Sequence, residues 1–256
     1  MLALKSGLSL NTARGSLRDE YALKLTGTEY VTCDSAAGKF DKDSGAFSVW
    51  VQLSSMSGSG HIMKIQVDAN NFVQLFYHNN SGEMRFAYKG GGAATNVINF
   101  DASSLEGDGT WHHLHCTWQT SSNRLSLFLD GEVEATQTSG LGAWSGTPTV
   151  FDIGQNTAGG NFFKGFVSEA ALFDTVVGVS TVYNTTTKNR VINLTGQSPY
   201  YLILFFLLLR IFSSYSGISV TQSGVLNISP VKPFPELSNA FAPAPSLNLQ
   251  YPTSPD

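Results

Sequence analysis

GTWHHLHCTWQTSSNRLSLFLDG, residues 109–131, is the stretch that decides the fold of this chain. Residue types alternate with period two in both of its halves, which four small polar residues separate. The apolar face so defined carries Leu114, Cys116, Trp118, Leu125, Leu127 and Leu129. Such alternation is typical of half-buried strands, and Asp130-Gly131 is a strong tight-turn signal. The stretch therefore predicts an antiparallel hairpin that ends at a two-residue turn.

Short runs of the same kind occur along most of the chain. Besides the two strands of that hairpin, the pattern predicts strands at residues 21–25, 29–33, 46–53, 61–67, 72–78, 83–89, 96–100, 149–153 and 161–173. No amphipathic helix of three turns precedes residue 174, and one helical turn is predicted within Val176–Tyr183. Eleven short strands at this spacing predict an all-β protein with two packed antiparallel sheets.

Composition agrees with this fold class and narrows the function. The 256 residues suffice for one large β-domain and an appendage, and 13% charged with 12% aromatic residues suits a two-sheet protein. The net charge is −4 and no basic stripe occurs, so we expect no nucleic-acid binding. The first residues lack the apolar run of a cleavable secretion signal. Exposure outside a cell would then need another route, such as assembly into a virus particle.

The two cysteines, Cys33 and Cys116, are too few for a disulfide scaffold or a cysteine-based zinc site. Each falls on a predicted strand, where a lone cysteine behaves as a small apolar residue. We expect two buried free thiols, and a single bridge between them is the alternative.

The hairpin and the order of the cues around it resemble laminin-G-like domains of the concanavalin A-like jelly-roll family. The resemblance covers residues 20–199 and rests, in order, on YALKLTGTEYVTC, FSVWV, the hairpin, FDIGQN with FFKGFVSEAALFD, and VYNTTTKNRVINLTGQSP. It implies a two-sheet antiparallel jelly-roll sandwich that binds sugars or proteins and less often cleaves glycans. The arm rich in Leu, Ser and Arg at residues 1–19, together with this tail, also resembles bacteriophage and marine viral structural proteins.

The chain departs from the family pattern after Pro199. YYLILFFLLLRIF, residues 200–212, is almost wholly apolar, but it is shorter than the ~20 residues that span a bilayer. It could be a strand or helix packed on the sandwich, an interface to another subunit, or a membrane-associated segment or altered reading frame. Residues 200–228 thus form an apolar extension, and the proline-rich tail at 229–256 is expected to be extended or disordered.

Paired carboxylates would mark an enzyme. A sandwich glycosidase of this architecture carries Glu-x-Asp-x-x-Glu on one strand, with the acid and the nucleophile about 5 Å apart. Glu169 has no acidic partner two residues away, and Glu132 and Glu134 alternate directly after a turn, where solvated carboxylates are ordinary. We therefore expect no enzymatic activity.

Two groups of residues could bind a metal ion. His112, His113 and His115 resemble a metal cluster, but two imidazoles on one strand face still need a third ligand, so these histidines are expected to brace the sheet or its turns. The family resemblance implies calcium in loops at the sandwich edge. Asp41 and Asp43, two alternating carboxylates before a glycine, are the candidate ligands.

Sugar binding needs exposed aromatic rings beside amides. The candidate rings are Trp144, Tyr77 and Tyr88, whereas Trp50 and Trp118 are expected in the core and Trp111 at a turn. The loop at residues 157–161 and the glycines at 90–92 would flank the site, with Asn156 and Asn161 as the amides that bond sugar hydroxyls.

Taken together, these patterns predict a non-enzymatic binding or adhesion module on a virion that recognises a glycan or a cell-surface partner. Residues 1–19 and 200–212 would attach it to other virion proteins or to a second copy. The alternatives are a purely structural virion subunit without glycan specificity and, disfavoured by the missing carboxylate pair, a polysaccharide hydrolase. An extracellular or cell-surface location is the alternative to the virion.

Overall fold

The structure, a computed structural model, describes residues 22–32, 34–37, 43–157, 159–190, 201–203, 221–223 and 227–229. Asp41, Cys33, the arm at residues 1–19 and most of the segment 200–212 lie outside these residues. Within the described part, no helix is long and apolar enough to cross a membrane.

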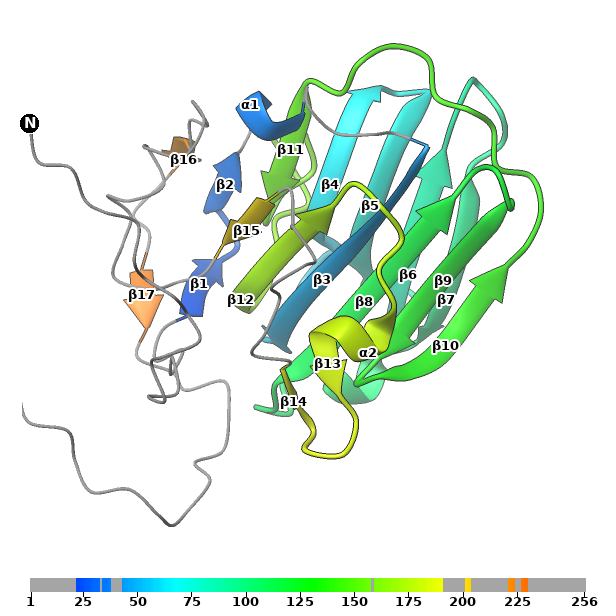
Figure 1. Cartoon of the computed structure of the whole chain (residues 1–256). Helices are drawn as coiled ribbons and strands as arrows, with labels where there is room; N and C mark the ends of the chain where they lie inside the picture. Colours follow the sequence, from blue (N-terminus) through cyan, green and yellow to red (C-terminus); the bar gives the residue numbers. More distant parts are fainter. Residues whose placement is uncertain are drawn as a thin grey trace, which may run out of the picture.

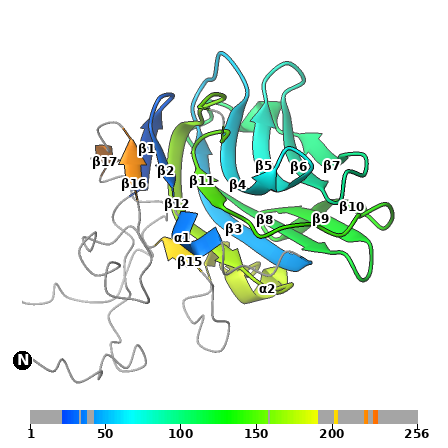
Figure 2. The same ribbon diagram turned by 90° about the horizontal axis from the view of Figure 1, so that it is seen from above.

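Two antiparallel sheets pack face to face, as Figures 1 and 2 show from two directions. Sheet A has the strand order β10 (Glu132–Gln137), β9 (Arg124–Leu129), β8 (His112–Gln119), β3 (Ser44–Leu53), β12 (Lys164–Phe173), β1 (Ala22–Thr26) and β17 (Asn227–Ser229), with β15 (Tyr201–Ile203) also paired to β12. Sheet B has the order β16 (Thr221–Ser223), β2 (Tyr30–Thr32), β11 (Val150–Ile153), β4 (Gly60–Asp68), β5 (Asn71–His78), β6 (Glu83–Lys89) and β7 (Asn96–Asp101).

Few other elements occur in the described residues. They are the helical turns α1 (Asp34–Ala37), η1 (Ser103–Leu105) and α2 (Val179–Val182), and the small hairpin of β13 (Tyr183–Asn184) and β14 (Asn189–Arg190). The predicted all-β jelly-roll sandwich and the helical turn near residue 180 are therefore confirmed.

The hairpin that decides the fold has the predicted geometry. Strands β8 and β9 pair in register from Leu114 opposite Leu129 to Gln119 opposite Arg124. Asp130 and Gly131 have φ angles of 47° and 88°, and Leu129 pairs with Glu132 across them. Positive φ at both central positions is the type I′ geometry that matches the twist of two-residue hairpins, which explains the Asp-Gly pair.

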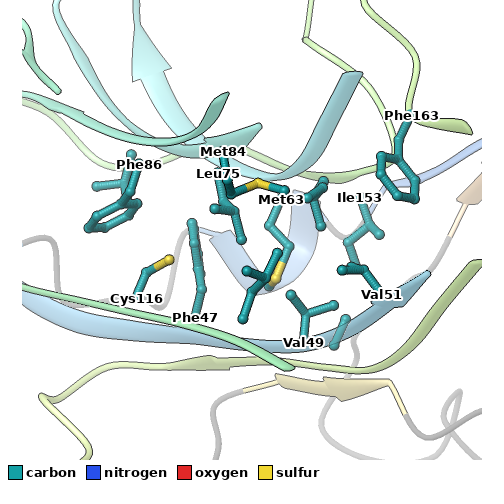
Figure 3. Packing of buried hydrophobic residues seen from close by; sticks show 14 of the residues in the cluster. Phe47, Val49, Val51, Met63, Leu75, Met84, Phe86, Cys116, Ile153 and Phe163 are labelled. Atoms are coloured by element: carbon teal, nitrogen blue, oxygen red, sulfur yellow. The ribbon is translucent and has the colours of Figure 1, made fainter. Parts of the chain in front are cut away.

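The core lies between the two sheets. Phe47, Val49 and Val51 of β3 point towards Met63, Leu75, Met84 and Phe86 of sheet B, and Cys116 lies among them (Figure 3). Trp118 is fully buried and packs edge-on against Phe47 at a centroid distance of 5.2 Å. Cys116 is a buried free thiol, as expected.

The strand prediction failed in one place. The pattern predicts eleven strands before residue 174 and the structure has twelve, since the pattern does not predict β10, which directly follows a turn. Strand β10 pairs only with β9 and most of its side chains are exposed. Its apolar residues are the exposed Val133 and the small Ala135, so the apolar alternation that identifies half-buried strands is weak. Within the apolar extension the structure describes Tyr201–Ile203, which adds strand β15 beside β12. It also describes residues 221–223, which form β16 beside β2, and residues 227 and 228, which belong to β17 beside β1.

Candidate functional site: the outer face of sheet B

The aromatic rings that were predicted from the sequence to stack on a sugar are buried. Trp144 is 4% exposed, Tyr77 1% and Tyr88 0%. The Tyr77 hydroxyl donates to Glu106 Oε2 at 2.7 Å, and the Tyr88 hydroxyl donates to the Gly142 carbonyl at 2.6 Å. A ring enclosed on both faces cannot stack on a sugar, so the prediction that these three rings are exposed is wrong.

Partly exposed aromatic residues occur instead on the opposite face of β5. Along this strand burial alternates strictly, with Val73, Leu75 and Tyr77 in the core. The partly exposed residues between them are Phe72, Gln74, Phe76 and His78, which we call the β5 strip. Alternation places these four side chains on one line on the outer face of sheet B.

Strand β4 supports the two rings of the strip. His61 pairs with Phe76 across the strands, and the two rings are stacked with centroids 4.9 Å apart and planes 10° apart. Lys64 pairs with Gln74, and its ammonium lies 5.6 Å from the centroid of the Phe72 ring. Both supporting side chains are buried. The rings are thus held by packing on one side while they stay partly exposed.

The loop after β11 brings the two predicted asparagines to the same face. Asn156 Oδ1 accepts a 2.7 Å hydrogen bond from Lys64 Nζ, and the backbone N–H of Asn156 donates to the Gly160 carbonyl at 2.9 Å. The Asn161 carbonyl accepts a 2.8 Å bond from the His61 N–H, and Asn161 has a φ of 49°. Of the predicted ligand-binding residues, the structure brings these two together beside the β5 strip.

A buried carboxyl lies next to this loop. Asp152 of β11 pairs with Lys64 across the strands, yet Lys64 Nζ donates to Asn156. Burial and the nearby charge of Asp34 raise the pKa of Asp152 to about 6, although Gln155, Lys64 and Thr157 oppose the shift. Burial and the charge of Lys64 lower the pKa of His61 to about 4. His61 is therefore neutral at pH 7, and Asp152 is mostly ionised.

The histidines of β8 have structural roles. His112 bridges two carboxylates, with Nδ1 2.8 Å from Asp130 Oδ2 and Nε2 3.1 Å from Asp108 Oδ2. His113 Nε2 is 2.9 Å from Ser48 Oγ, and His115 Nε2 donates to the Val177 carbonyl at 2.8 Å. The interpretation of these histidines as braces of the sheet and its turns fits these contacts.

The predicted calcium ligands gain no support from the described residues. Asp43 is exposed at the start of β3, and its carbonyl accepts a hydrogen bond from the Thr120 N–H. Its predicted partner Asp41 lies outside the described residues. No group of three or more His, Cys, Asp or Glu side chains that could hold a metal occurs in the part of the chain that the structure describes. Calcium binding at Asp41 and Asp43 therefore remains a prediction.

Phe72 and Phe76 were not singled out as site residues, although the strand that carries them was predicted. A signal was present, because Gln74 and His78 share their side of the alternation and a polar residue marks the outer face of a half-buried strand. Tyr77 belongs to the other face, together with Val73 and Leu75.

Comparison with known proteins identifies the family. The family model of the concanavalin A-like lectin/glucanases superfamily matches residues 25–182 of this chain. A search of curated protein sequences gives no match. Among solved structures, the CBM40 domain of the Ruminococcus gnavus IT-sialidase, bound to α2,3-sialyllactose, has a TM-score of 0.52 at 14% identity, covering 62% of this chain and 92% of that one.

Two further structures are similar. The native heptameric SAP-like pentraxin of Limulus polyphemus has a TM-score of 0.53 at 14% identity, covering 81% of this chain and 94% of that one. Domains LG4-5 of the mouse laminin α1 chain have a TM-score of 0.47 at 19% identity, and the match covers 59% of this chain and 40% of that one. Such identities show a shared fold alone. The match of the family model over residues 25–182 assigns the chain to the concanavalin A-like lectin/glucanases superfamily.

Proposed function

We propose that this chain is a non-enzymatic glycan-binding module whose binding face is the outer face of sheet B. The observation that carries the proposal is the β5 strip, in which two partly exposed phenylalanines stand on either side of Gln74. Sugars offer apolar ring faces and many hydroxyls, so aromatic rings beside amides match them. Asn156 and Asn161 add further polar groups at the edge of this face.

The similar structures support this proposal at the level of the fold. The CBM40 domain, which is bound to α2,3-sialyllactose in its structure, shares the sandwich at a TM-score of 0.52. A shared fold does not carry a ligand from one protein to another, so the argument rests on the residues of the β5 strip.

Binding without hydrolysis fits the carboxylates near the strip better than catalysis does. Glycoside hydrolysis requires two carboxyl groups, about 5 to 9.5 Å apart, on either side of the scissile bond. The strip itself carries none, and Asp152 is buried beside Lys64 and the loop after β11. Glu83 and Asp101 pair across β6 and β7 next to His78, but Glu83 accepts hydrogen bonds from Arg85 and Ser81, and Asp101 accepts one from the Ser103 hydroxyl. Glu132 and Glu134 lie on the exposed edge strand β10. We therefore expect no release of reducing ends from laminarin-type glucans, by the wild type or by Asp152→Asn.

A place on a virion is part of the proposal and rests on the resemblance of the arm and tail to viral structural proteins. The attachment segments would be residues 1–19 and 200–212. If they attach the module, deleting residues 1–19 should release a soluble protein that still binds its glycan. A structural subunit without glycan specificity would assemble through the same segments and bind no sugar.

The first experiment is a glycan array probed with the full chain, once with calcium and once with EDTA. Specific binding that Phe76→Ala weakens is the expected result. Loss of this binding in EDTA would establish a calcium requirement and direct mutagenesis to Asp41 and Asp43. Absence of binding in both conditions would overturn the proposal and favour the structural subunit.

A further inference from the structure

The two rings of the β5 strip lie too far apart for one sugar unit. Phe72 and Phe76 are separated by four residues on the same face of a strand, which corresponds to about 13 Å at ~3.3 Å per residue. A single pyranose ring is shorter than this span. Gln74 lies halfway between the rings. Its amide interacts with His61, and its remaining donor and acceptor capacity can serve a hydroxyl of an intervening unit.

Both rings are supported in a way that suits a preorganised binding surface. Phe76 stacks on His61 and Phe72 is contacted by the Lys64 ammonium, so each ring has a neighbour on the β4 side. Lys64 is itself held by Asn156. Supporting contacts of this kind lower the conformational entropy that a ligand must remove on binding.

Each cation beside the strip has an acidic neighbour. Arg85 Nη2 lies 2.7 Å from Glu83 Oε2, and Arg85 Nε donates to the same oxygen. Hydrogen bonds from Asn70 and Asn71 lower the pKa of Asp68, and the charge of Lys89 adds to this shift. Lys64 pairs across the strands with Asp152, whose charge opposes the lowering of the Lys64 pKa by burial. The charges around the strip are thus compensated, which does not favour an acidic ligand.

We infer that the β5 strip binds a neutral, linear oligosaccharide that lies along β5 and contacts both Phe72 and Phe76. The inference rests on the proposed glycan-binding function and adds the class of ligand: a chain of several uncharged sugar units rather than a terminal monosaccharide or an acidic sugar. A hydroxyl of a central unit would bond the Gln74 amide.

Affinity as a function of chain length tests this inference. The probes are linear β-1,3-gluco-, β-1,4-gluco- and β-1,4-manno-oligosaccharides, from the monosaccharide to the hexasaccharide, with oligogalacturonates of the same lengths as acidic counterparts. Calorimetry with the full chain should show affinity for one neutral series that rises with length until both rings are covered. Because the ligand is neutral, raising NaCl to about 0.5 M should leave this affinity unchanged.

Alanine variants then separate the two ends of the strip. Phe72→Ala and Phe76→Ala should each weaken binding of the longest oligosaccharide about tenfold, equivalent to ~1.4 kcal/mol. A short oligosaccharide that reaches one ring should respond to one of the two variants only. Phe166→Ala is the matched control, since Phe166 is a half-buried phenylalanine on sheet A, next to Trp111. Its glycan affinity should equal that of the wild type.

The outcomes distinguish this inference from the proposed function. If an array of neutral and acidic glycans gives no binding at all, the proposed function fails. If the monosaccharide binds as well as the hexasaccharide, or if an acidic series binds better and salt weakens it, the module binds glycans and the linear neutral ligand is wrong. Equal loss of affinity in Phe166→Ala would also overturn the assignment to the β5 strip.

Discussion

The outer faces of the two sheets differ although their strands show the same alternation. On sheet A, the outward side chains Trp50, His113 and His115 are buried, because the segment after β12 lies across them. Figures 1 and 2 show α2 of this segment on the side of sheet A that faces away from sheet B. On sheet B, Phe72 and Phe76 also point outward but remain partly exposed. Exposure therefore depends on what covers a face and not on the alternation within its strands.

The covered part of sheet A resembles a second, smaller core. His113 stacks on Tyr183 with centroids 5.1 Å apart, and Trp50 lies 5.7 Å from the same ring. A buried apolar cluster of Ala46, Ala171, Phe173, Val177 and Val182 continues this layer. Stability should therefore respond to changes on this face, whereas ligand binding should respond to changes on sheet B.

The largest expected effect compares one outward aromatic residue from each sheet. Trp50→Ala should lower the free energy of unfolding by about 3–5 kcal/mol, as expected for a buried tryptophan, whereas Phe76→Ala should cost about 1 kcal/mol. Urea denaturation of both variants measures the difference. Equal losses would mean that sheet B is covered as sheet A is, which would remove the basis of the proposed binding face.

The second-largest expected effect is a loss of stability at low pH, caused by the buried histidines of the covered face. Burial lowers the pKa of His113 well below 6.5 and that of His115 to about 4, so folding favours their neutral forms. Their contribution to stability is complete above pH 6.5 and is lost as the pH falls towards 4, at most ~3 kcal/mol for His115. Asp152, with a raised pKa of about 6, shifts stability in the opposite direction over part of this range.

A glutamine at position 115 isolates the histidine contribution, because Asp152 affects the wild type and the variant alike. His115→Gln retains a donor for the Val177 carbonyl but no group that titrates in this range. Urea unfolding between pH 7 and pH 4.5 should show a smaller loss of stability for His115→Gln than for the wild type. Parallel pH profiles would contradict a neutral buried imidazole at this position.

The smallest expected effect concerns His112, at the start of β8. Burial disfavours its charged form, but the hydrogen bonds to Asp130 and Asp108 dominate and raise the pKa of His112 above 6.5. A raised pKa stabilises the fold below pH 6.5, and this stabilisation is lost as the pH rises through the folded-state value. His112→Gln should cost on the order of 1 kcal/mol at pH 6 and less at pH 8, because the partly exposed pairs are screened by solvent. A cost that grows with pH would contradict the charged bridge.

Local patterns were sufficient for much of the fold but not for the site. The Asp130-Gly131 turn and the inward face of Leu114, Cys116 and Trp118 depend on neighbours close in sequence, so the alternation predicts them. The burial of Trp144 depends on packing against Tyr88, which lies more than fifty residues earlier. No local pattern contains that contact. The sequence therefore suggested an exposed ring in a glycine-rich loop, where the structure has a core residue.

The faces of β5 show the same limit at a smaller scale. Alternation divides Phe72, Gln74 and Phe76 from Val73, Leu75 and Tyr77, and an aromatic residue occurs on each side. Tyr77 was predicted from the sequence as a candidate ring, but its side chain is buried and its hydroxyl donates to Glu106. Weighing the polar residues of each side would have selected the outer face, whereas the support from His61 and Lys64 becomes visible only when β4 is paired to β5.

The reactivity of the Cys116 thiol reports how often the sandwich opens. It is fully buried between the sheets, and burial raises its pKa well above the ordinary value, so the reactive thiolate is suppressed in the folded protein. Alkylation at Cys116 therefore requires the two sheets to separate. The labelling rate of its peptide, which mass spectrometry distinguishes from the peptide of Cys33, reports how often this separation occurs under native conditions.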